Sequence, residues 1–85
     1  MTSRTIARPA APNAPRPAEV RAERGTPVTV AGVRVKEVRE FWIVEDRWWT
    51  EQPIHRHYWE LITVQGRNVV VFHDKLTDRW FSQTA

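Results

Sequence analysis

The chain has 85 residues, which limits it to one domain, and it contains no cysteine for a disulfide or a thiolate zinc site. No apolar run approaches the roughly 20 residues of a membrane span, and no apolar secretory signal begins the chain, so we expect a cytoplasmic protein. Residues 1–25 carry the whole net charge of +3, whereas the basic and acidic side chains of residues 26–85 cancel. Composition therefore does not demand a basic folded face for nucleic acid.

Residues 1–25 are expected to form a disordered tail rich in proline, alanine and arginine. Four prolines fall within residues 1–18, and each one removes a backbone donor and disfavours helix at the residue before it. Residues 17–24 could form two helical turns, but an isolated helix of that length is marginal. The folded part is accordingly expected to begin at residue 26.

Residues 26–46 show the alternation of apolar and polar side chains that is typical of strands. Ala31 and Gly32 are suited to a two-residue hairpin turn. The apolar positions slip by one residue after Val35, which indicates a bulge or a short break in the strand. Residues 41–44 are apolar on both faces and are expected to form a strand covered on each side. Residues 45–47 are expected to form a turn.

Residues 50–53 are expected to form a loop, and residues 55–64 a long strand with Tyr58 and Trp59 on opposite sides. Turns are expected at residues 65–68 and 74–78, and a last short strand at residues 79–81. The sequence thus predicts a small all-β domain of five to six short strands over residues 26–85. Its architecture would be either a strongly bent antiparallel sheet or an SH3-like barrel.

The histidines are the only pattern that suggests a metal. His55 and His57 lie two residues apart, so on a strand they point to one face, and His73 could join them. No cysteine or acidic cluster completes such a ligand set, so we expect no metal and no cofactor. The sequence also has no nucleophile elbow, phosphate-binding glycine loop or Walker lysine, and we expect a binding module instead of an enzyme.

Aromatic residues are the most informative group, with five Trp, three Phe and one Tyr in the chain. Core burial is the simplest role for Trp42, Trp59 and Trp80. Trp48 and Trp49 are adjacent, so on a strand only one of them can be fully buried and the other is available for contact. The predicted binding patch combines this pair with nearby basic and polar rings: Arg47, Trp48, Trp49, Arg56, His57 and Tyr58.

The segment 28–81 resembles a small bacterial domain found alone or at the C-terminus of ImuB-like proteins, which are inactive relatives of Y-family polymerases. The resemblance rests on the hairpin before Phe41-Trp42, on residues 47–49 and 56–61, on residues 71–74 and on the closing residues 78–81. It implies a link to damage-induced mutagenesis and contacts with other proteins of that apparatus. The chain lacks any polymerase-like part, and a shared domain does not by itself give a shared role.

Three functions remain open at this point. The first is a protein-interaction adaptor, with a partner in bacterial DNA-damage tolerance. The second is a module that binds single-stranded nucleic acid, with the arginine-rich tail attracting phosphates and an exposed tryptophan stacking on bases. The third is a metal-dependent enzyme that uses His55, His57 and His73.

Overall fold

The computed structural model describes residues 15–46, 49–51 and 53–83. These residues form seven strands and no helix, which confirms the predicted all-β class and exceeds the expected five to six strands. The strands are β1 (Arg16–Pro17), β2 (Val20–Glu23), β3 (Thr26–Val30), β4 (Val33–Asp46), β5 (Ile54–Thr63), β6 (Asn68–Asp74) and β7 (Arg79–Ser82). No helix among the described residues is long and apolar enough to cross a membrane.

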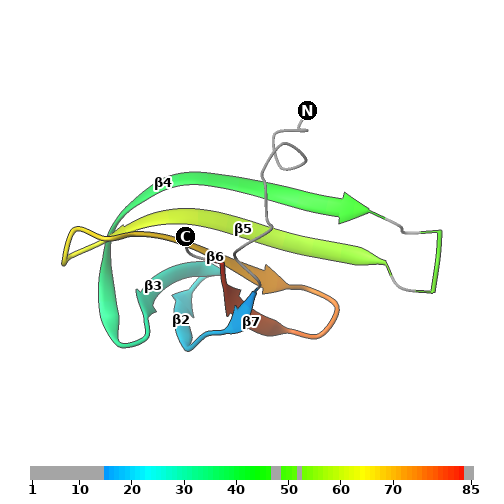
Figure 1. Ribbon diagram of the computed structural model, residues 1–85, viewed down its shortest axis with the longest axis horizontal. Helices are drawn as coiled ribbons and strands as arrows, with labels where there is room; N and C mark the ends of the chain where they lie inside the picture. The colour runs from blue at the N-terminus through cyan, green and yellow to red at the C-terminus, as the bar shows by residue number, and fades with distance from the viewer. Residues whose placement is uncertain (1–14, 47–48, 52, 84–85) are drawn as a thin grey trace.

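All seven strands belong to one antiparallel sheet in the order β1-β7-β6-β5-β4-β3-β2. Strands β1 and β2 lie at opposite edges of this sheet although only residues 18–19 separate them in the chain. Ala18 N donates to Trp80 O (3.0 Å) on β7, and Glu19 O accepts from Ala31 N (2.7 Å) beyond β3. Because only two residues link strands at opposite edges, the sheet must curl strongly enough to bring these edges close together. Of the two expected architectures, the structure shows the strongly bent sheet, which forms a half-barrel (Figure 1).

The bend is concentrated in β4. Its register against β5 shifts between Val35 and Glu37 and again between Val38 and Glu40, so the bulge predicted after Val35 is confirmed and a second one follows it. Bulges increase strand twist and bend, and here β4 curves down to β3, which places β2 and β3 across the concave side of the sheet (Figure 1). The turn predicted at residues 45–47 is wrong for Glu45 and Asp46, because both still pair with β5.

The predicted hairpin turns are present. Ala31 and Gly32 have φ values of 52° and 81°, as a type I′ turn requires, and the described structure also turns at residues 64–66 and 75–78. A further turn of the same kind joins β2 to β3, where Arg24 and Gly25 have φ values of 54° and 83°.

Apolar side chains form one cluster on each face of the sheet. The concave cluster contains Val30, Trp59, Leu61 and Val71, and the convex cluster contains Trp42, Tyr58 and Phe72. The opposite placement of Tyr58 and Trp59 was predicted and is confirmed. Burial of the segment 41–44 on both faces was predicted and is wrong, because Phe41 and Ile43 on the concave side are 46% and 48% exposed.

The folded part begins earlier than expected. Residues 16–17 pair with β7 and residues 20–23 pair with β3, so a boundary at residue 25 and the helical alternative for residues 17–24 are both wrong. Val20 packs against the concave cluster, which explains why this short charged segment joins the sheet. The disorder predicted for residues 1–14 concerns positions outside the described residues.

Candidate functional site: an aromatic groove on the concave face

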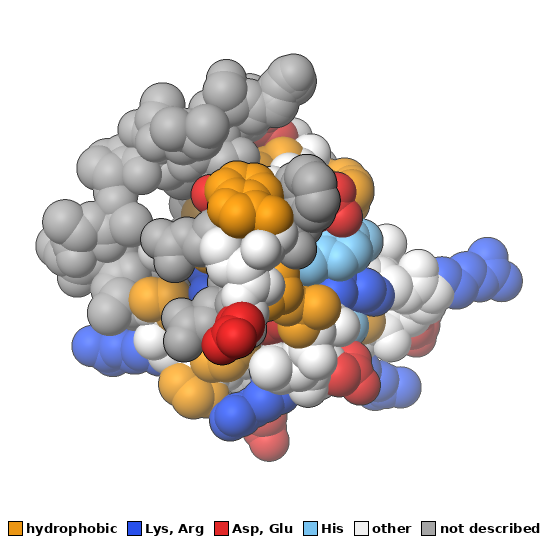
Figure 2. Space-filling model, turned by 90° about the vertical axis from the view of Figure 1, so that its right-hand side faces the viewer, with side chains coloured by type: hydrophobic (Ala, Val, Ile, Leu, Met, Phe, Trp, Pro, Cys, Tyr) orange, Lys and Arg blue, Asp and Glu red, His pale blue; other side chains and the backbone are white. Residues whose placement is uncertain are grey.

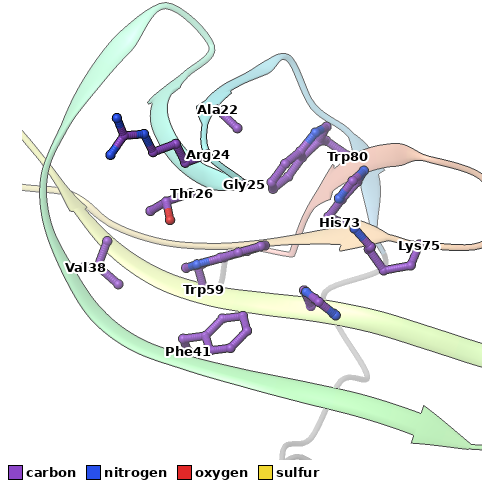
Figure 3. Close-up of a pocket in the computed structure, with 11 residues that line it drawn as sticks. Ala22, Arg24, Gly25, Thr26, Val38, Phe41, Trp59, His73, Lys75 and Trp80 are labelled. Carbon is purple, nitrogen blue, oxygen red and sulfur yellow. The ribbon is translucent and has the colours of Figure 1, made fainter.

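A groove of about 690 Å³ lies on the concave face between the β2–β3 turn and strands β4 to β7 (Figure 3). This volume falls in the usual range for ligand sites in proteins. The side chains that give the groove its chemical character are Arg24, Phe41, His57, Trp59, His73, Lys75 and Trp80.

Four rings form a continuous series along the groove. Phe41 contacts Trp59 with ring centroids 5.1 Å apart, and Trp59 contacts Trp80 at 5.3 Å. Trp80 then stacks on His73, with centroids 4.4 Å apart and ring planes within 6°. Trp59 is 6% exposed and forms the floor, whereas Phe41 is 46% exposed and offers its ring to a ligand.

Strand register brings these rings together. Phe41 lies opposite Trp59 in the β4–β5 pair, His57 lies opposite His73 in the β5–β6 pair, and His73 lies opposite Trp80 in the β6–β7 pair. Residues directly opposite in an antiparallel pair carry their side chains on the same face. A row of rings from four strands is therefore the direct result of the register.

Two cations lie on opposite sides of the groove, with Arg24 at the β2–β3 turn and Lys75 after β6 (Figure 3). The left-handed backbone conformation of Arg24, beside Gly25, lets the chain turn tightly at the groove margin. Among the described residues that line the groove there is no carboxylate. Its charge thus favours an anionic ligand.

The three histidines share this face. The ring centroids of His55 and His57 are 5.3 Å apart. His73 Nε2 lies 2.7 Å from Asp78 Oδ1, and His55 Nε2 lies 3.4 Å from Glu45 Oε2. Burial lowers the pKa of His57 below its usual 6.5; Lys75, His55 and His73 lower it further, and only Glu45 acts in the opposite direction.

The described residues contain no group of three or more His, Asp or Glu side chains arranged to hold a metal ion. Instead, each of two carboxylates pairs with one histidine: Asp78 with His73, and Glu45 with His55. A shared face was predicted for His55 and His57, and the pairing of His57 with His73 places the third histidine on it as well.

The predicted binding patch does not form a single surface. His57 lines the groove, whereas Arg56 and Tyr58 belong to the convex face, where Arg56 Nη1 donates to Tyr58 Oη (3.4 Å) and Arg56 Cζ lies 4.6 Å from the Phe72 ring centroid. Tyr58 is buried. The prediction had grouped neighbours in sequence, but adjacent strand residues point to opposite faces.

Of the remaining members of the predicted patch, the structure describes Trp49, in the connection between β4 and β5. Trp49 is 66% exposed, as expected for one ring of the Trp48–Trp49 pair. Arg47 and Trp48 lie outside the described residues. The predicted burial of Trp42 and Trp59 is confirmed, and Trp80 is half-buried.

The groove residues that were missed as site residues are Arg24, Phe41, Trp59, Lys75 and Trp80, and a signal for Trp80 was present. The turn near residue 65 fixes the β5–β6 register and so pairs His57 with His73, and the turn at residues 75–78 then pairs His73 with Trp80. Arg24 carried no such signal, because the composition of residues 1–25 is typical of a disordered tail.

Comparisons with protein-family models, with curated proteins and with solved structures found no match to this chain. The fold and the groove describe a small curled β module whose concave face carries aromatic rings flanked by two cations.

Proposed function

We propose that this protein binds single-stranded nucleic acid in the concave groove. The observation that carries the proposal is the series Phe41–Trp59–Trp80–His73, flanked by Arg24 and Lys75 and without a carboxylate among the described lining residues. Proteins that bind single strands combine stacking rings with a positive groove that follows the phosphates. Both elements occur here in one surface.

The charge distribution supports a polyanion over other ligands of aromatic grooves. A groove for a cationic or methylated amine would gain from carboxylates, and the described lining supplies none. The folded part as a whole is close to neutral, so the positive character of the groove is local. We propose a binding module, since stacking and ion pairing account for the groove residues without a catalytic step.

Replacement of Phe41 by alanine tests the stacking contribution. Phe41 is the most exposed groove ring, and base–aromatic stacking contributes about 1–3 kcal/mol per base. We expect Phe41→Ala to weaken binding of a fluorescent oligodeoxythymidylate at least roughly fivefold, measured by anisotropy. Val64→Ala is the matched control, because Val64 is 52% exposed and does not line the groove. Equal affinity of wild type and Phe41→Ala would exclude stacking on this ring.

A second candidate function is the protein-interaction adaptor, and the exposed apolar side chains of β4 favour it. Val38, Phe41 and Ile43 are 42–48% exposed, and Trp49 lies near the end of the same hairpin. Figure 2 views this end of the molecule and shows hydrophobic side chains at the surface beside histidines. Rings of this kind often anchor protein interfaces. The resemblance to the ImuB-associated domain supports a partner in DNA-damage tolerance.

Cross-linking in cells with Ile43→Ser and Trp49→Ala variants tests the adaptor. Both side chains are about half or more exposed and neither lines the groove, so these changes should leave nucleic-acid binding within roughly twofold. The adaptor function predicts that a specific cross-linked partner is lost in both variants. The same set of partners in wild type and variants would argue against it.

A further inference from the structure

One end of the groove gathers four side chains that can carry positive charge. Lys75, His57 and His73 line the groove, and His55 contacts His57. Figure 3 places Lys75 beside His73, at the end away from Arg24. These side chains come from β5, β6 and the turn after β6, and Lys75 N is held there by a hydrogen bond to His55 O (2.9 Å). The cluster is therefore fixed by the sheet.

Carboxylates balance two members of this cluster. Asp78, from the β6–β7 turn, lies 2.7 Å from His73, and Glu45, from β4, lies 3.4 Å from His55. Among the described residues no carboxylate forms an ion pair with His57, and the strand residues that face it from β4 are the apolar Phe41 and Ile43. The charge of Lys75 is thus available to a ligand, and His57 can add a second charge if it takes up a proton.

His57 is mostly neutral at pH 7 in the free protein. Its pKa lies below the usual value because of burial and because of Lys75, His55 and His73, with Glu45 opposing them more weakly. An anion placed among these groups would offset the repulsion and stabilise the imidazolium. The proton would come from solvent, and no covalent bond changes.

We propose that this end of the groove is a phosphate subsite, in which Lys75 and His57 bind one phosphate of the strand and His57 takes up a proton on binding. This inference rests on the proposed function and assigns a place for the backbone in it. Arg24, at the other side of the groove, is left to contact a second phosphate.

Proton uptake makes the affinity depend on pH. Because the bound form has the higher His57 pKa, acid favours binding over the range between the free and bound pKa values. We expect the affinity for an oligodeoxythymidylate of about ten nucleotides to rise about three- to tenfold from about pH 8 to about pH 6. Calorimetry of the full chain in two buffers of different ionisation enthalpy should show uptake of a fraction of one proton.

Two variants locate the proton. His57→Asn should abolish both the uptake and the rise in affinity with acid, whereas His55→Asn should keep them, since His55 does not line the groove. Uptake that persists in His57→Asn, or binding without uptake in the wild type, would overturn the subsite.

A second measurement needs no variant and no oligonucleotide. Inorganic phosphate should raise the pKa of His57, which is followed by NMR of its ring protons. If phosphate has this effect but the oligonucleotide does not bind, the subsite stands and the proposed function falls. If the oligonucleotide binds without proton uptake, the proposed function stands and the subsite falls. Absence of both effects would overturn both.

Discussion

Replacement of Phe72 by alanine should lower the free energy of unfolding by about 3–5 kcal/mol. Phe72 is 1% exposed and lies in the convex cluster, where its ring is 4.8 Å from that of Tyr58 and 5.1 Å from that of Phe81. Truncation removes these contacts and leaves a cavity that a sheet of this size cannot close. Because small domains are stable by only about 5–15 kcal/mol, the variant should be close to unfolding.

Urea denaturation followed by tryptophan fluorescence measures this loss. Leu76→Ala is the control, because Leu76 is 54% exposed in the β6–β7 turn and its truncation should change stability by less than about 0.5 kcal/mol. A loss below about 1 kcal/mol for Phe72→Ala would mean that the convex cluster is not a core of the fold.

Reversal of the two groove cations should weaken binding of a single strand at least roughly 25-fold near 0.1 M salt. Each neutralised phosphate contributes about 0.7 to the slope of log affinity against log salt, which is roughly fivefold in affinity at that concentration. The double variant Arg24→Glu and Lys75→Glu removes two such contacts and adds repulsion inside the groove. The magnitude of the salt slope should fall by about 1.4 as well.

The control for charge alone is Lys36→Glu with Arg39→Glu. Both residues are exposed on β4 and neither lines the groove. Each double variant replaces two cations with two glutamates, so the two variants have the same net charge. Anisotropy titrations at several salt concentrations should show a much smaller loss for it. An equal loss in the two double variants would mean that the strand responds to overall charge and not to the groove.

Much of the sheet could be predicted because its signals are local. Alternation indicated β3, most of β4 and β5, and the expected turns at residues 65–68 and 74–78 bounded β6. Gly32 and Gly66 marked turns that need a positive φ. The slip after Val35 revealed a bulge because the pleat has a period of two residues. Each of these features depends on a few consecutive residues.

The edge strands of the sheet and the groove were harder to predict from the sequence, because they depend on contacts between distant segments. Strand β2 has only Val20 and Ala22 as apolar residues, and it is held by pairing with β3 and by packing on the concave cluster. The exposure of Phe41 follows from the curl of the sheet and not from its own segment. The groove needs Arg24 and Trp80 on one face, and that requires the closure made by residues 18–19.

The most direct test of the proposed groove is NMR of the indole N–H resonances of three tryptophans, which report on the two faces of the sheet. Trp59 and Trp80 belong to the groove, whereas Trp42 belongs to the convex cluster. On addition of an oligodeoxythymidylate, the resonances of Trp59 and Trp80 should shift in a saturable way while that of Trp42 stays in place. No shift at all, or a shift of Trp42 with Trp59 and Trp80 unchanged, would contradict binding in the groove.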